Sequence, residues 1–365
     1  MAKERNHQID LWRFVFSVII VIHHTKNLFG DDKSKFLGGS LAVEFFFLVS
    51  GYLMMASIER SGQGTGSVTL DTVRFIKKKW CGFYPEVLVA WGIAFIFTMY
   101  ASRAGIREIL SRFASGFLEG LLLFSTGLVG NSVNPATWYM SSMLLGMLIL
   151  YPLIRKYPKA MKYYIMPLSA ILLWGWMCAE DRNTRNPTYW MGLTYKGNIR
   201  ALCELQMGAI LYYINQKFKN VNFTKIGKTV LTVVEWGCYM AVILYMYFRT
   251  ASKKDIFFIT LMCIAVLITF SGKAYYFKGK NVGTLFTFLG KFSFPLFLSH
   301  HAYTLHLNNL LPETFTYSQK MAVYLVCACT TALAVWGISA LLRKNSGRIL
   351  QAGKRLFVEK EALNV

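Results

Sequence analysis

DLWRFVFSVIIVIHH, residues 10–24, is an apolar stretch that is interrupted by Asp10, Arg13 and the pair His23 and His24. At about 100° per residue, Arg13 and His24 return to within about 20° of one face of a helix, whereas His23 points about 80° away. The helical rise separates Arg13 and His24 by about 16 Å along the axis. Ionisable groups in lipid cost several kcal/mol unless they line a polar interior. The stretch therefore predicts a transmembrane helix whose polar face borders a functional site, with Asp10 on the same stripe.

The rest of the chain repeats this apolar character. It has 365 residues, of which 55% are hydrophobic and 16% aromatic, and its mean hydropathy is +0.39. Apolar runs of roughly 17 to 24 residues recur along it, which is typical of polytopic membrane proteins. We therefore expect an all-α transmembrane helix bundle. The ten predicted spans are 9–29, 41–58, 82–101, 138–154, 161–179, 199–215, 229–248, 256–271, 292–311 and 320–342.

The net charge of +22 does not indicate a nucleic-acid partner, because the charges lie in short clusters between apolar runs. With ten spans and both termini cytoplasmic, roughly twice as many Lys and Arg residues lie inside as outside, as the positive-inside rule requires. A further span at 115–131 would reverse that balance. We therefore expect 103–131 to form a re-entrant or interfacial element on the outer side, in one transmembrane domain over 1–342 with a basic cytoplasmic tail at 343–365. The predicted location is the cell membrane.

Two side chains on the first predicted helix suit group-transfer chemistry. The imidazole of His24 can take a proton from a hydroxyl group or accept an acyl group, and the guanidinium of Arg13 can bind a phosphate or carboxylate. Glu44, near the outer end of the second predicted helix, can orient the imidazole or balance its charge, as can Asp10. The alternative is that Asp10 and Arg13 form a structural pair and that His24 and Glu44 lie at the membrane surface.

Each of the remaining candidate residues is weaker evidence for a functional site when it is considered alone. Lys77, Lys78 and Lys79 can bind a nucleotide phosphate, or they can serve as a topology signal that contacts anionic lipids. Ser50 lies beside Gly51 within a predicted helix, where the two residues allow close helix packing or a local kink. His300 belongs to the second of two predicted helices that together carry five of the six His residues.

We assign four residues on the outer side to the acceptor. Trp138 and Tyr139 are otherwise typical of an aromatic belt at the membrane surface. Arg200 and Glu204 are spaced as a structural i, i+4 ion pair. The seven Cys residues lie in or beside apolar runs without the spacing of a metal site or disulfide framework, so we expect no metal site.

At this point the residues show a family resemblance. The chain resembles the acyltransferase type 3 family of membrane O-acyltransferases in five motifs. They are I-D-x-x-R followed by His24, V-x-x-F-F-x-x-S-G-Y-L-M from Val43, a basic run ending in Y-P at Pro85, W-Y-M from Trp138, and L-G-K-x-S-x-x-x-x-L-x-H from Leu289 to His300. The resemblance covers the whole chain. It departs from the family at Gly82, where an Arg is frequent, and at Phe294 and Phe297, where Tyr is usual.

The resemblance implies that an acyl group, most often acetyl, passes from a cytoplasmic acyl-CoA to a hydroxyl of an extracytoplasmic glycan or lipid-linked saccharide. It implies that His24 is the catalytic His and Arg13 the essential Arg, and that Asp10, Ser50 and His300 fall on conserved motifs. Acetyl-CoA would then be a co-substrate, with no permanently bound cofactor. The lipid bilayer is the other expected partner, and the oligomeric state stays open.

Two other functions remain open at this point. The Arg13 and His24 stripe can relay protons or bind an anion in a transporter or channel. The chain can also be a membrane anchor for a polysaccharide assembly complex, without catalysis. Release of a thiol from acyl-CoA by the purified protein would distinguish the enzyme from both.

Overall fold

The structure is a computed structural model that describes residues 5–29, 35–62, 66–130, 132–181, 185–250, 252–277 and 279–362, with side chains described as far as Asn345. These residues are largely helical. Among them there is no strand, and one isolated bridge joins Trp190 and Tyr195. The predicted all-α class is confirmed.

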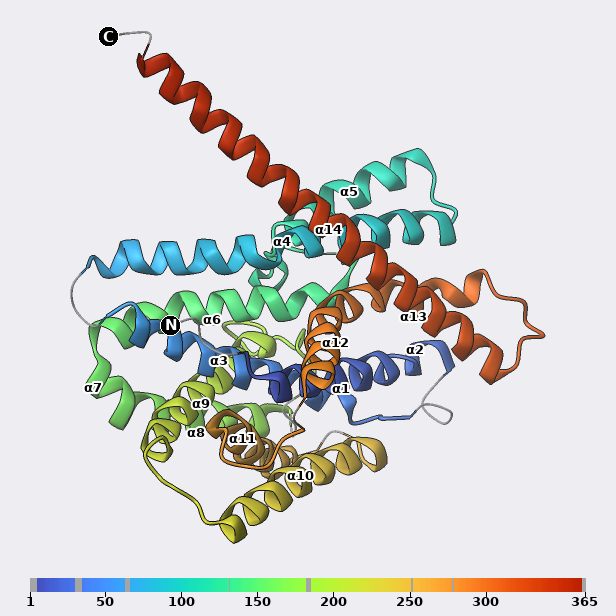
Figure 1. Cartoon of the computed structure of the whole chain (residues 1–365). Coiled ribbons are helices and arrows are strands. Elements are labelled where there is room, and N and C mark those ends of the chain that lie inside the picture. The colour runs from blue at the N-terminus through green and yellow to red at the C-terminus, as the bar shows by residue number, and fades with distance from the viewer. Residues whose placement is uncertain are drawn as a thin grey trace.

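Fourteen helices follow one another along the described chain, several of them shorter than two turns (Figure 1). They are α1 (His7–His23), α2 (Lys26–Phe29), α3 (Ala42–Arg60), α4 (Val68–Ala101), α5 (Ile106–Gly120), α6 (Trp138–Lys156), α7 (Pro158–Ala160), α8 (Met166–Asp181), α9 (Lys196–Phe218), α10 (Lys225–Phe248), α11 (Asp255–Ser271), α12 (Lys280–Ser299), α13 (His301–His306) and α14 (Tyr317–Ala362).

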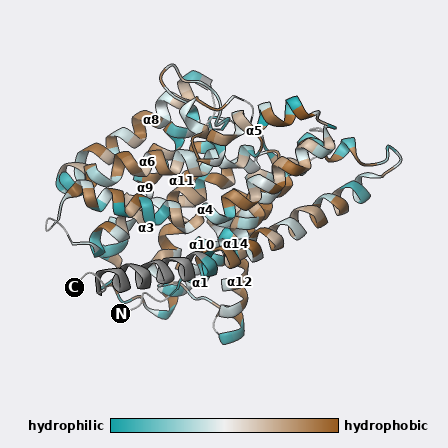
Figure 2. Cartoon of the chain, turned by 90° about the horizontal axis from the view of Figure 1, so that it is seen from above, coloured by the Kyte–Doolittle hydropathy of each residue, from teal (hydrophilic) through white to brown (hydrophobic). Residues whose placement is uncertain are grey.

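Each of the ten predicted spans overlaps one of these helices. Six helical segments in the described chain are long and apolar enough to cross a membrane. They are Gly39–Arg60, Val68–Ala101, Pro135–Lys156, Lys225–Phe248, Lys280–Asn309 and Tyr317–Asn345. Hydrophobic residues run along the helices, and hydrophilic ones gather toward helix ends and connections (Figure 2). The chain is thus a multi-pass membrane protein, and the remaining four spans stay predictions.

Several helices extend beyond the predicted spans. The helix α4 begins at Val68, because residues 68–81 form an amphipathic extension that a hydropathy count does not detect. The helix α12 begins at Lys280 and ends at Ser299, so that His300 lies at its junction with α13. The helix α14 continues through most of the predicted tail and projects from the bundle (Figure 1); residues 363–365 lie outside the described chain.

Two close helix pairs set the geometry of the interior. A Cβ on Gly51 of α3 would lie 2.1 Å from the carbonyl oxygen of Leu205 on α9. A Cβ on Gly290 of α12 would lie 2.5 Å from the Cβ of Asp10 on α1. Glycine therefore allows backbones to approach at both crossings, and the role in close packing that we predicted beside Ser50 is confirmed.

The segment after α4 does not form another span in its described part. The helix α5 presents Ile106, Leu110, Phe113 and Phe117 to the surroundings, one turn apart on a single face. Behind it, the fully buried Glu119 accepts hydrogen bonds from the backbone of the loop that leads into α6. This arrangement is that of an amphipathic helix on the bundle periphery, in keeping with the interfacial element predicted for 103–131.

Candidate active site

The rotation of α1 is set by its aromatic side chains. Trp12 stacks on Tyr239 with ring centroids 3.9 Å apart, and Phe16 stacks on Phe45 at 4.6 Å. These contacts fix one face of α1 against α3 and α10. Asp10 is buried on the same helix, and Arg13 and His24 each line a cavity. The polar stripe of α1 therefore faces the interior of the bundle.

Arg13 lines a cavity of about 570 Å³, which we call the Arg13 cavity. Its cationic groups are those of Arg13, Arg60, Lys78 and Lys79, and no carboxylate is among its described lining residues. The complete lining is Arg13, Ser17, Val43, Phe46, Val49, Ser50, Leu53, Ser57, Arg60, Phe75, Lys78, Lys79, Gly82, Phe83, Tyr139, Met140, Met143, Gly290, Ser293, Phe294 and Phe297. Because Arg60 and Lys78 are exposed, the cations begin at the surface and continue inward to Arg13.

Asp10 orients Arg13 and does not approach His24. Its Oδ1 lies 3.8 Å from Nη1 of Arg13, and the carboxylate also binds Arg5. The structural pair that we left open in the sequence is therefore present. It positions a guanidinium at the wall of the cavity, so that the structural and functional interpretations apply together.

The lysine cluster divides according to helix rotation. Lys78 and Lys79 line the Arg13 cavity, whereas Lys77 is exposed and is absent from the lining. A change of 100° per residue separates the three side chains, so a contiguous run cannot face one cavity as a unit. Arg60 lines the cavity from the last residue of α3. Sequence analysis missed Arg60, because an Arg at the end of an apolar helix also fits a topology signal.

The two aromatic residues assigned to the acceptor lie in different walls. Tyr139 lines the Arg13 cavity, where its hydroxyl lies 3.2 Å from Oγ of Ser50. Trp138 instead lines a second cavity together with His24. Val43 belongs to both linings, so this residue lies between the two cavities.

The second cavity, which we call the His24 cavity, has a volume of about 420 Å³. It lies at the opposite end of α1 from the Arg13 cavity. Its lining is His23, His24, Lys26, Leu37, Ser40, Val43, Trp138, Arg185, Asn186, Pro187, Arg200 and Thr250. Sequence analysis missed Lys26 and Arg185, which reach it from connecting segments that carry no motif.

Hydrogen bonds determine which nitrogen of His24 carries the proton. Nδ1 of His24 lies 2.9 Å from the carbonyl oxygen of Ile20, which can only accept, so Nδ1 is the protonated nitrogen. The same Nδ1 lies 3.2 Å from Nε2 of His300. Nδ1 of His300 donates in turn to the carbonyl oxygen of Phe297 at 2.7 Å. In the neutral pair, Nε2 of His24 is therefore left unprotonated, as a general base or nucleophile requires.

The neighbouring His residues differ from His24 in their contacts. Nδ1 of His23 lies 2.8 Å from the carbonyl oxygen of Phe36, and His23 also lines the His24 cavity. The rings of His24 and His301 are 4.8 Å apart. In the part of the chain that the structure describes, no group of three or more His, Cys, Asp or Glu residues is arranged to hold a metal ion.

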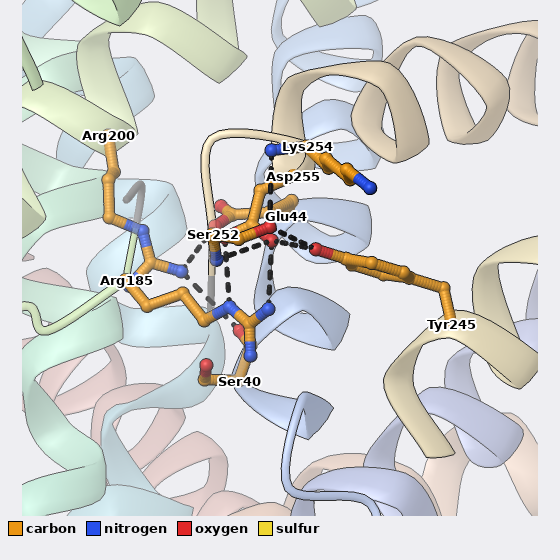
Figure 3. Close-up of polar contacts among 8 residues, drawn as sticks. All are labelled: Ser40, Glu44, Arg185, Arg200, Tyr245, Ser252, Lys254 and Asp255. Carbon is orange, nitrogen blue, oxygen red and sulfur yellow. Dashed lines mark hydrogen bonds and ion pairs between the residues drawn. The ribbon is translucent and has the colours of Figure 1, made fainter. Parts of the chain in front are cut away.

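The ion pair predicted between Arg200 and Glu204 is wrong in its partner. Arg200 forms a fully buried ion pair with Glu44 of α3, while neither carboxyl oxygen of Glu204 has a hydrogen-bond partner in the described structure (Figure 3 shows the Glu44 pair). The close packing of α3 on α9 favours the contact between helices over the one within α9. Glu44 consequently lies beside Arg200, and the prediction that it orients His24 is wrong.

A family model described as an acyltransferase domain, that of the acyltransferase type 3 family, matches residues 6–341. The chain belongs to this family. No curated protein and no solved structure gives a significant match. Membership of the acyltransferase type 3 family and the multi-pass helical fold together indicate a membrane acyltransferase.

Proposed function

We propose that this acyltransferase moves an acetyl group from cytoplasmic acetyl-CoA to a hydroxyl of an extracytoplasmic glycan or lipid-linked saccharide. In this proposal the Arg13 cavity receives the donor, and the His24 cavity receives the acceptor. The observation that carries the proposal is that Val43 lines both of these cavities. One has four cations at its wall, and the other has a histidine with an unprotonated Nε2.

The charges of the Arg13 cavity suit the donor. The phosphates of CoA would lie against Arg60, Lys78 and Lys79, because Lys and Arg form charge-assisted hydrogen bonds with phosphate oxygens. The thioester arm would extend past Arg13 toward Phe46 and Phe297, which line the same cavity. The distance of about 16 Å along α1 between Arg13 and His24 is comparable with an extended pantetheine arm.

The protonation of His24 suits the acceptor step. Nε2 would take the proton of the acceptor hydroxyl as its oxygen attacks the thioester carbonyl carbon. The bond from that carbon to sulfur then breaks, and the leaving thiolate takes the proton back from Nε2. An acyl-imidazole on Nε2 is the two-step form of the same transfer. Ser50 and Tyr139, which contact each other at the wall of the Arg13 cavity, would border the thioester.

The test uses the purified full-length chain in nanodiscs with acetyl-CoA and an envelope glycan extract of the host. We expect free thiol to appear together with acetyl groups on the extract, and His24→Ala to lower both by at least about 100-fold. His7→Ala, at the opposite end of α1, is the matched control. Thiol release and acetylation that are unchanged in His24→Ala would refute the role of His24, and a wild type that releases no thiol would favour the transporter or the anchor.

A further inference from the structure

The wall of the His24 cavity is one-sided in charge. Lys26, Arg185 and Arg200 line it, and no carboxylate is among its described lining residues. The carboxylates that pair with the two arginines lie behind them. Asp255 binds Arg185 through two hydrogen bonds, at 2.9 and 2.8 Å, and Glu44 binds Arg200 (Figure 3).

Arg200 is held in place, but not all of its hydrogen-bond donors have an acceptor. Its side chain is fully buried, and Cζ lies 5.1 Å from the ring centroid of Trp138. Only Nη2 has hydrogen-bond partners, Glu44 and the carbonyl oxygen of Ser40; Nε and Nη1 have none in the described structure. Leaving charged donors buried without an acceptor is costly. A guanidinium in this state at a cavity wall is suited to an oxygen ligand that arrives from the cavity.

Lys26 supplies a charge that no described carboxylate balances. It lies two residues after His24, is half-buried, and forms no ion pair within 4 Å in the described chain. The two Arg residues are each paired, so among the described residues of the cavity wall Lys26 provides the surplus positive charge. A neutral sugar hydroxyl would not use that surplus, whereas an anion would.

We propose that the acceptor carries an anionic group, a carboxylate or a phosphate, close to the hydroxyl that is acylated, and that Lys26 and Arg200 bind it. This inference rests on the proposed function, since it concerns the acceptor of the same transfer. Binding of the anion by these two residues positions the neighbouring hydroxyl at Nε2 of His24. Arg185 also lines the cavity, but its charge is balanced by Asp255.

The experiment uses radiolabelled acetyl-CoA, the full chain in nanodiscs, and the host's envelope glycan extract in three forms. One form is untreated, one has its carboxyl groups reduced to alcohols after carbodiimide activation, and one has its phosphate esters cleaved with hydrofluoric acid. Label that is lost only after carboxyl reduction identifies an acidic sugar, and label that is lost only after phosphate cleavage identifies a phosphate-linked saccharide. Either result supports the proposal. Equal labelling of all three forms would overturn it while leaving the proposed function intact, and no labelling of any form would refute the proposed function itself.

Variants give a second measurement. Lys26→Gln should raise the KM for the untreated extract about 10-fold or more while the KM for acetyl-CoA stays the same, since charged hydrogen bonds typically contribute this much to binding. Arg200→Gln is combined with Glu44→Gln, so that no lone buried charge destabilises the fold, and should act in the same direction. Lys35→Gln is the matched control, because Lys35 is exposed near Tyr247 and does not line the cavity. An unchanged KM for the extract in both Lys26→Gln and the double variant would overturn the proposal.

Discussion

His300 is expected to position His24 and not to carry out the chemistry itself. Nε2 of His300 accepts a hydrogen bond from Nδ1 of His24 at 3.2 Å, while the carbonyl oxygen of Ile20 accepts from the same nitrogen at 2.9 Å. Replacing His300 with Ala removes the longer of two contacts that favour one tautomer. The shorter contact remains in the variant, so most His24 side chains keep the proton on Nδ1.

The size of the effect follows from this geometry. A neutral hydrogen bond contributes about 0.5–1.5 kcal/mol, which corresponds to about 2- to 12-fold in rate. His300→Ala should therefore lower kcat by about that factor. Loss of the general base itself typically costs 100- to 10,000-fold. The two roles thus predict rates that differ by at least about one order of magnitude.

The assay is thiol release from acetyl-CoA in the presence of the glycan extract, measured for variants of equal thermal stability. His300→Gln, whose amide oxygen can accept from Nδ1, should recover part of the lost kcat, and the KM for acetyl-CoA should stay constant. His306→Ala, at the last residue of α13, serves as the control. A loss in His300→Ala as large as that in His24→Ala, without recovery in His300→Gln, would refute the reasoning and assign proton transfer to His300.

Three further predictions concern the walls of the cavities and the packing behind them. Arg13→Lys keeps the charge but loses the planar guanidinium, and should raise the KM for acetyl-CoA about 10-fold in steady-state kinetics. Arg60→Gln should raise the same KM less, by about 2- to 5-fold, because an exposed cation at the cavity entrance is screened by solvent. An increase in KM larger than that of Arg13→Lys would contradict the interpretation that Arg13 contributes more than Arg60 to donor binding. Gly51→Ala should destabilise the fold by about 1–3 kcal/mol, since its Cβ would lie 2.1 Å from a backbone oxygen of α9. Gly237→Ala, where a Cβ meets nothing within 4 Å, should leave the melting temperature in detergent unchanged or slightly raised, and equal melting temperatures for the two glycine variants would contradict the packing argument.

The position of Arg13 and His24 on one helix face could be predicted from the sequence. The eleven-residue spacing of Arg13 and His24 requires only helical geometry, and the structure places both side chains at cavity walls. The same reasoning failed for Glu44. Its partner depends on how α3 lies against α9, and the glycine at position 51 indicates close packing without indicating which helix approaches.

Residues from connecting segments could not be found in this way. Lys26 and Arg185 reach the His24 cavity from a short helix and a loop, where neither spacing nor hydropathy distinguishes a site residue from a surface cation. The start of α12 was missed for a related reason. The polar first turns of α12, from Lys280, read as a loop by hydropathy, although they continue the helix that brings His300 level with His24.

In the proposed transfer, the position of Val43 would keep the reactive thioester from water while the donor and the acceptor enter from opposite sides of the membrane. Val43 is 5% exposed and lines both cavities, and on the donor side Phe46 and Phe297 lie in the same wall. Apolar side chains between the cationic cavity and His24 would exclude water from the place where the thioester meets the hydroxyl. Val43 also lies between the positive charges proposed to hold the donor and those proposed to hold the acceptor. Selectivity for the acceptor can therefore vary through residues such as Lys26 and Arg200 without altering how the donor is bound.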